Sequence, residues 1–253
     1  MDTKSAIKPF INPIKAGLFK SDVEKTMAEH YSAPPPNSLE PTNIWKERIE
    51  RELIDLYSGQ AAIDKAAMGY DAIAEDLRSH LSPKEFDKIY QEWSHGVERW
   101  ISFVKSAESK SAEAEIKAEC LGEMMGISEG TLVNFYAAGN RYFSSQNFEK
   151  ASNAFYVVVT LDHRRYNAWI AYALSEMKSQ HWEQAIFGFA MGSITNIDSP
   201  YPYMYAADCC LHCNRIDEAK VYLNLAKEAL EKSQLANKQL LMASVTKLQQ
   251  SLK

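Results

Sequence analysis

Bulky and small residues recur three times at a spacing of 34 residues between Leu132 and Leu225. Each copy has a bulky side chain, a small residue four positions later, an alanine twelve positions after that, and a Phe or Leu four positions further on. A fixed period of this length predicts helical hairpins, because a pair of helices buries its apolar face only by stacking on the next pair. In chain order these residues are Phe135, Gly139, Ala151 and Phe155, then Trp169, Ala173, Ala185 and Phe189, then Tyr203, Ala207, Ala219 and Leu223.

The sizes of these residues explain how such hairpins would pack. Small residues on both sides of a short polar break, Ser145-Gln146-Asn147 in the first copy, let the two helices approach closely. The bulky residues then fill the space between units. This is the tetratricopeptide (TPR) pattern. The eleventh position is Tyr142 in the first copy but Glu176 and Cys210 in the others, and the usual proline is replaced by His163 and Ile197.

Hydrophobic residues at steps of three and four predict further helices on both sides of the repeats. We expect helices at about 44–57, 61–81, 83–104 and 113–126 before the repeats, and at about 235–252 after them. Ser82, Pro83 and Glu85 form a capping-box pattern with proline in the first turn. The last helix has a polar back, as the end of a solenoid requires. Because no strand pattern appears, the predicted fold class is all-α.

These patterns divide the chain into three predicted parts. Residues 1–43 form a proline-containing mobile arm, residues 44–130 a helical N-terminal region, and residues 131–253 the TPR domain with its capping helix. Six of the nine prolines lie in the arm, which has few apolar anchors. We expect a solvated tail there, or a segment that docks on a partner or on the chain's own groove. The repeats span about 132–165, 166–199 and 200–233.

The composition, with 46% hydrophobic and 24% charged residues, is that of an ordinary globular protein. The N-terminal residues lack the apolar core and small-residue cleavage site of a secretory signal, and no apolar run is long enough to cross a bilayer, so we expect a cytosolic protein. The net charge of −5 comes from intermixed basic and acidic residues. That distribution argues against nucleic acid as a partner, because phosphate binding needs a concentrated basic face.

Residue types that carry catalysis or bind metals are present but not grouped. Cys209, Cys210 and Cys213 share one predicted helical turn, so they point in diverging directions and are expected to be reduced and packed between helices. The histidines are scattered, and no glycine-rich phosphate loop is present. Asp71 and Glu75 read as a solvated helix face rather than an acid and base pair. We therefore predict a protein that is not an enzyme and that holds no metal or cofactor.

Within the repeats a narrower resemblance appears. The chain is similar there to the TPR chaperones that serve the pore-forming translocators of bacterial type III secretion, the class II or LcrH/SycD-like family. The resemblance runs from Leu132 to Leu230. The helices before it are a departure, since members of that family usually have only a short N-terminal helix. The features that carry the resemblance are the lead-in from Gly126 to Leu132 and Phe135-Tyr136, the tripeptide Leu161-Asp162-His163, the Ala185-Ile186 step with Phe189 and Gly192, and the run from Pro200 through Ala206-Ala207-Asp208-Cys209 to Leu211.

The resemblance implies a bacterial, cytoplasmic chaperone that binds apolar segments of a secreted translocator or effector client and keeps it unassembled until export. The implied partner is a hydrophobic translocator protein, a homodimer is left open, and neither nucleic acid binding nor membrane insertion is expected. One alternative is a general TPR adaptor or regulator with a different protein partner. Another is a helical N-terminal module with its own activity, docked by the repeats.

A binding surface follows from the geometry of stacked hairpins. The first helix of each hairpin lines the concave side, with repeat positions two, five, nine and twelve facing inward. Most of these residues are apolar or aromatic, and Met and Tyr suit a surface that accepts extended peptide with tolerance for sequence. The same side chains could instead pack under a neighbouring helix. The predicted client-binding residues are Val133, Tyr136, Asn140, Phe143, Asn167, Ile170, Leu174, Met177, Tyr201, Met204, Asp208 and Leu211.

Overall fold

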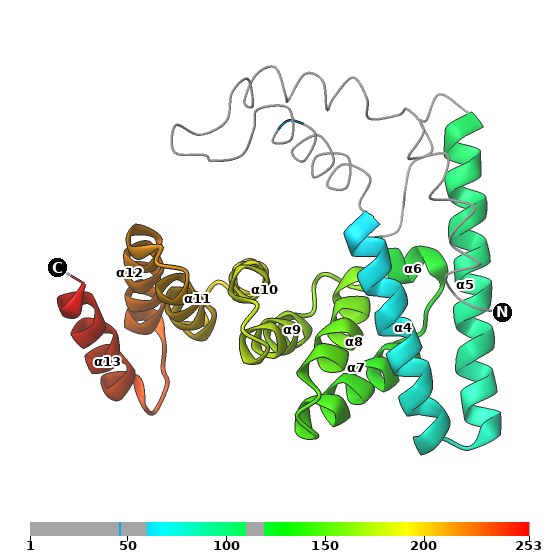
Figure 1. The fold of residues 1–253 in the computed structure, drawn as a ribbon, viewed down its shortest axis with the longest axis horizontal. Coiled ribbons are helices and arrows are strands. Elements are labelled where there is room, and N and C mark those ends of the chain that lie inside the picture. Colours follow the sequence, from blue (N-terminus) through cyan, green and yellow to red (C-terminus); the bar gives the residue numbers. More distant parts are fainter. Residues whose placement is uncertain (1–45, 47–59, 110–118, 253) are drawn as a thin grey trace. The chain divides into compact units, whose positions relative to one another are not determined.

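The computed structural model describes residues 46, 60–109 and 119–252. All regular elements in these ranges are α-helices, which confirms the predicted fold class (Figure 1). The chain divides into two compact units, residues 1–67 and residues 68–253, and the TPR repeats lie in the second. The predicted arm and nearly all of the predicted helix at 44–57 lie outside the described residues. The three-part domain division stays a prediction.

The helix boundaries follow the hydrophobic pattern closely. Ser82 and Glu85 form the predicted capping box at the start of α5, with the backbone N–H of Ser82 donating to Glu85 Oε2 at 3.0 Å and that of Glu85 donating to Ser82 Oγ at 3.4 Å. Of the helix predicted at 113–126, only α6 and its flanks are described. The helices are α4 Gln60–His80, α5 Pro83–Ser109, α6 Leu121–Met125, α7 Glu129–Ser144, α8 Phe148–Leu161, α9 Tyr166–Lys178, α10 Trp182–Thr195, α11 Tyr201–His212, α12 Ile216–Lys232 and α13 Lys238–Ser251.

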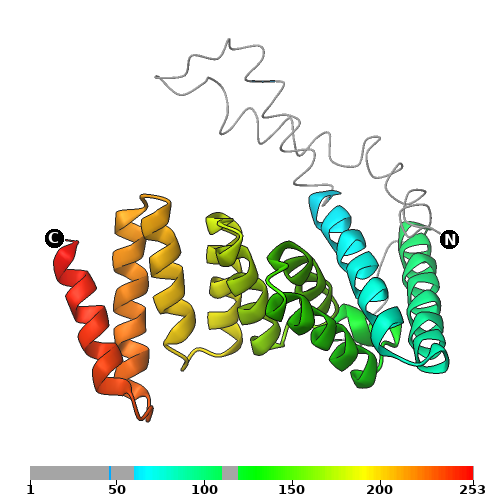
Figure 2. The same cartoon turned by 60° about the horizontal axis from the view of Figure 1, so that its bottom comes forward.

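Three helical hairpins, α7 with α8, α9 with α10 and α11 with α12, stack in chain order (Figure 2). The second helix of each hairpin packs on the first helix of the next one. All the bulky, small and alanine positions that define the repeats are buried. Helices α7 and α8 approach closely at Gly139, where a Cβ atom would lie 2.6 Å from the ring of Phe155. The residue sizes read from the sequence therefore do set the spacing of the hairpins.

The turn inside each hairpin has the same backbone conformation. Gln146, Gln180 and Asn214 occupy equivalent repeat positions and have φ values of 61°, 62° and 58°. In the first turn the N–H of Gln146 donates to the carbonyl of Phe143 at 3.0 Å, and the N–H of Asn147 donates to that of Tyr142 at 2.9 Å. This pair of bonds is a Schellman motif, which satisfies the last carbonyls of the first helix and reverses the chain.

Helices α4 and α5 pack on the first repeat and share its core. Tyr70 of α4 stacks on Trp93 of α5 with ring centroids 4.3 Å apart, and both rings meet Phe135 of α7 edge-on. Gly69 lets α4 approach α8 so closely that a Cβ atom there would lie 2.0 Å from the carbonyl oxygen of Asn153. The N-terminal hairpin is therefore built into the same hydrophobic core as repeat one.

Polar contacts fix the register of α4 on that repeat. The buried carboxylate of Asp76 accepts two hydrogen bonds of 3.0 Å from Arg141 Nε, and the hydroxyl of Tyr142 donates to the carbonyl of Ala72 at 2.9 Å. Lys150 of α8 pairs with Glu75 at 2.6 Å. Because a buried carboxylate is stable only when it is paired, Asp76 and Arg141 hold the two helices in one alignment.

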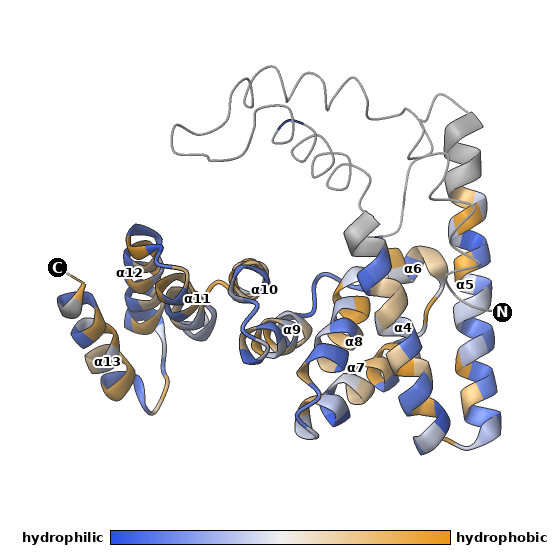
Figure 3. Cartoon of the chain, in the orientation of Figure 1, coloured by the Kyte–Doolittle hydropathy of each residue, from blue (hydrophilic) through white to orange (hydrophobic). Residues whose placement is uncertain are grey.

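Helix α13 closes the other end of the stack. Val245 is fully buried against α12, and Leu241, Leu248 and Leu252 pack beside it. Figure 3 shows blue, hydrophilic segments along α13, and Gln239, Ser244, Lys247 and Gln250 are exposed there. This arrangement agrees with a capping helix whose polar back faces water.

The departure from the repeat pattern at Glu176 has a structural explanation. Its carboxylate is 1% exposed and lies between the second and third helices of the stack. It accepts a hydrogen bond from the hydroxyl of Ser152 on α8 and contacts Nδ1 of His181 at 2.8 Å. Ser152 and His181 thus provide the partners that a buried carboxylate needs.

Candidate peptide-binding groove

The predicted groove residues all lie on the first helices of the hairpins, α7, α9 and α11. The spacing of three and four residues keeps the four positions of each helix on one face. All twelve are exposed or half-exposed, whereas the core positions of the same helices are buried. That they bind a client stays a prediction. Exposed are Val133, Asn140 and Asn167, and half-exposed are Tyr136, Phe143, Ile170, Leu174, Met177, Tyr201, Met204, Asp208 and Leu211.

The inner ends of the apolar side chains pack on the core and hold the outer ends in place. The ring of Tyr136 lies 5.3 Å from that of Phe155, and the ring of Phe143 lies 5.3 Å from that of Phe148. Their exposed surfaces are thus pre-organised, which lowers the entropic cost of binding. The others that pack partly on the core are Ile170, Leu174, Met177, Met204 and Leu211.

Polar groups are few on this face. Burial raises the pKa of Tyr136 while a hydrogen bond to Asn140 opposes the change, so the phenol stays protonated at neutral pH. Asp208 is the one charged residue among the twelve. The face can therefore offer apolar contacts along its length and hydrogen bonds from the amides of Asn140 and Asn167.

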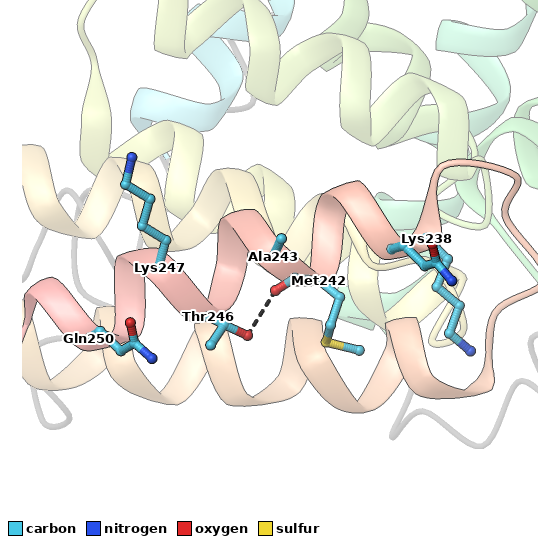
Figure 4. Close-up of a pocket in the computed structure, with 7 residues that line it drawn as sticks. Lys238, Met242, Ala243, Thr246, Lys247 and Gln250 are labelled. Carbon is cyan, nitrogen blue, oxygen red and sulfur yellow. Dashed lines mark hydrogen bonds between the residues drawn. The ribbon is translucent and has the colours of Figure 1, made fainter.

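Two depressions of the described surface lie largely outside this set. One, of about 660 Å³, runs along the outer face of α13 (Figure 4). The hydroxyl of Thr246 donates to the carbonyl of Met242 at 2.8 Å there, and Lys238 Nζ donates to the carbonyls of Glu231 and Ser233. All the residues that line this depression lie on α13, and none is a predicted groove residue. The other, of about 640 Å³, lies between the C-terminal ends of α4 and α7 and includes Asn140.

The cysteines are free thiols, as predicted. Burial raises the pKa of Cys209 to about 12 and that of Cys210 to about 11, so both are protonated at neutral pH. In residues 60–109 and 119–252, no three His, Cys, Asp or Glu side chains are grouped so as to bind a metal ion. None of the helices described has the length and apolar character needed to cross a membrane.

Comparison with known proteins gives matches in both sequence and structure. No family model matches the chain. Over 104 residues the chain is 27% identical to the low calcium response locus protein H of Yersinia pestis, and also to that of Yersinia pseudotuberculosis. The match covers 41% of this chain and 62% of the relative, so the chain spans less than two thirds of the length of these relatives. The resemblance to LcrH/SycD-like chaperones is confirmed.

Solved structures also match the chain. The type III secretion translocator chaperone SycD of Yersinia enterocolitica has a TM-score of 0.46 and 22% identity, over 53% of this chain and 98% of that chain. SycD in complex with a peptide of the translocator YopD has a TM-score of 0.46 and 23% identity, over 50% and 95%. A CopN-Scc3 complex matches with a TM-score of 0.49 and 20% identity, over 57% and 84%.

The Leu161-Asp162-His163 tripeptide, part of the resemblance to the LcrH/SycD-like family, has a structural role. Asp162 accepts hydrogen bonds from Arg164 Nε at 2.8 Å and from Arg165 Nε at 3.1 Å. Arg164 also pairs with Glu119, just before α6, and with Glu123 in α6, and Arg165 also pairs with Glu129 at the start of α7. One carboxylate thus ties the turn between repeats one and two to the lead-in of repeat one. The sequence pattern identified this tripeptide, but it did not predict the ion pairs that Arg164 and Arg165 form around Asp162.

Replacing Asp162 with Asn is expected to make stability less dependent on pH in acid. Burial opposes ionisation of Asp162, but the hydrogen bonds from Arg164 and the charges of both arginines hold its pKa below the ordinary value. Because the pKa of Asp162 is lower in the folded than in the unfolded protein, its ionised carboxylate stabilises the fold above about pH 4. This stabilisation is lost as the pH falls through the folded-state pKa and the carboxylate takes up a proton. At pH 7 we expect the variant to lose about 2 kcal/mol of unfolding free energy.

Urea unfolding of both proteins from pH 7 down to pH 3 measures this effect. The difference between wild type and Asp162→Asn should shrink as the pH falls below about 4. Asp87→Asn, on the exposed face of α5, is the control and should leave the curve unchanged. A difference that is constant over this range would contradict the role assigned to Asp162.

Proposed function

We propose that this protein is a type III secretion chaperone that binds apolar segments of a secreted translocator or effector client in its TPR groove. The observation that carries the proposal is the match to the low calcium response locus protein H over 104 residues. The exposed apolar positions on α7, α9 and α11 support it, because such a surface is costly in water unless a ligand covers it.

The chemistry of the groove suits an extended apolar peptide. Leu174, Met177 and Met204 offer flexible aliphatic contacts, and methionine adapts to side chains of different shape. Asn140 and Asn167 are exposed and can hydrogen-bond the backbone of a bound strand. Binding would cover apolar segments of the client that otherwise promote its aggregation or premature assembly.

This function needs no catalysis and no cofactor, and we place the protein in the bacterial cytoplasm, where a client is held before export. The solved complex of SycD with a peptide of YopD is a precedent for a chaperone of this kind holding a translocator segment. Helices α4 and α5 share the core of repeat one, and this favours a structural role for them over a separate activity docked by the repeats.

Co-expression with candidate translocators tests the proposal. The client is expected in the soluble fraction, in a complex with this protein, only when the two are made together. If no candidate gains solubility, the chaperone function is wrong. A general TPR adaptor is the rival, and it would instead co-purify from the native host with a partner that is soluble on its own.

A further inference from the structure

Asp208 on α11 is a half-exposed carboxylate whose side chain makes no hydrogen bond and no ion pair within the described residues. Carboxylates that are partly withdrawn from water normally have such a partner. Asp208 is therefore an exception among the carboxylates of the described ranges that are buried or half-exposed. The other four accept hydrogen bonds: Asp76 from Arg141, Glu92 from Ser128, Asp162 from Arg164 and Arg165, and Glu176 from Ser152.

A possible partner on the same helix is engaged elsewhere. His212 follows Asp208 by four residues, a spacing at which acidic and basic side chains commonly pair on a helix. Its ring instead stacks on that of Trp182 on α10, with centroids 4.0 Å apart and an angle of 5° between the planes. Met204, four residues before Asp208, and Leu211, three residues after it, are apolar. The carboxylate thus lies between apolar neighbours on the groove face.

Asp208 does not stabilise its own helix either. Aspartate has a low helix propensity, and a negative charge near the C-terminal end of a helix is unfavourable. Asp208 lies four residues before His212, the last residue of α11. We therefore expect Asp208→Asn to leave the melting temperature unchanged or to raise it slightly. A residue that breaks local rules without a compensating contact inside the protein is characteristic of a functional site.

The equivalent position differs between the three repeats. Asn140, Leu174 and Asp208 are 34 residues apart and occupy repeat position nine on α7, α9 and α11. This position of the groove thus presents an amide, an aliphatic side chain and a carboxylate in chain order. No lysine, arginine or histidine is among the twelve groove residues, so the charge of Asp208 is not compensated within that set.

We propose that Asp208 selects client segments in which a lysine or arginine stands beside the apolar residues, and that this cation pairs with the Asp208 carboxylate. The inference rests on the proposed function, because it concerns what the same groove accepts. A segment that is apolar throughout would remove the hydration of the carboxylate without replacing it, which is costly. A basic side chain replaces that hydration with charge-assisted hydrogen bonds. Asp208 thus disfavours segments that are wholly apolar or that carry an acidic residue at this place.

An array of short overlapping peptides from the translocator that this protein keeps soluble on co-expression tests the proposal. The full chain is applied as wild type, as Asp208→Lys and as Asp198→Lys. The wild type is expected to retain peptides in which Lys or Arg flanks an apolar run. Asp208→Lys should lose these peptides and retain ones with Asp or Glu there. Asp198→Lys is the matched control, because it changes the net charge equally at an exposed residue in the turn before α11, and it should behave as the wild type does.

A titration with one retained peptide, and with the same peptide after its basic residue is replaced by Glu, gives the magnitude. The wild type should bind the charge-reversed peptide about a hundredfold more weakly, and Asp208→Asn should bind the original about tenfold more weakly. If the wild type binds both peptides equally, or if Asp208→Lys keeps the wild-type preference, this inference is wrong and the chaperone function stands. If the wild type retains no peptide of the client that it keeps soluble, the proposed binding of client segments in the groove is wrong as well.

Discussion

Tyr136→Glu combined with Met204→Glu is expected to weaken binding of an apolar client segment by about a hundredfold or more, while the helix content stays unchanged. Both side chains are half-exposed, so a carboxylate at either position reaches water when the groove is empty. When an apolar peptide covers the groove, the two charges lose that hydration without gaining a partner. Each such loss costs about 2 kcal/mol or more, and 1.4 kcal/mol is tenfold in affinity.

The measurement is a titration with a fluorescent peptide taken from the translocator that this protein keeps soluble on co-expression. Tyr90→Glu is the control, because Tyr90 is an exposed aromatic residue on α5, outside the groove. We expect it to bind as the wild type does. If the double variant retains wild-type affinity and its circular dichroism is also unchanged, the client binds elsewhere on the protein.

A single methyl group at residue 69 is expected to lower the melting temperature by about 6 to 12 °C. In Gly69→Ala the new Cβ atom would lie 2.0 Å from the carbonyl oxygen of Asn153 and 2.7 Å from Cγ2 of Val157. The nearer group is helix backbone, so it cannot rotate away, and α4 must shift outward from α8. Overpacking of this kind costs about 3 kcal/mol, and each kcal/mol corresponds to about 2 to 4 °C in a chain of this size.

Thermal unfolding followed by circular dichroism measures the change. Gly130→Ala is the matched control, since an added Cβ atom there meets only Ser128 Oγ at 3.9 Å. Alanine also has the higher helix propensity, so this control should melt at the wild-type temperature or slightly above it. An equal melting temperature for Gly69→Ala and the wild type would show that α4 is not packed closely on α8 in solution.

The sequence by itself determined the repeat architecture. Phe135, Gly139, Ala151 and their equivalents recur at a fixed spacing. Small side chains at these positions predict close helix contacts, and bulky ones predict filled gaps between repeats. All of these positions are buried, and the capping box at Ser82 forms as predicted. The predicted groove residues are accessible, since helical periodicity alone separates the core face from the outer face.

Only the tertiary structure decided which surfaces cover one another. Gly69 lies within the helix predicted at 61–81 without any distinguishing pattern, but its backbone lies directly against Asn153, 84 positions further along the chain. Glu176 likewise finds Ser152 on α8, and the two arginines beside Asp162 reach Glu119, Glu123 and Glu129. Local patterning encodes which face of a helix avoids water, whereas the partner that covers this face depends on the packing of distant segments. For that reason the exposure of Phe187 and Ile194 on α10 in the described structure could not be read from the sequence.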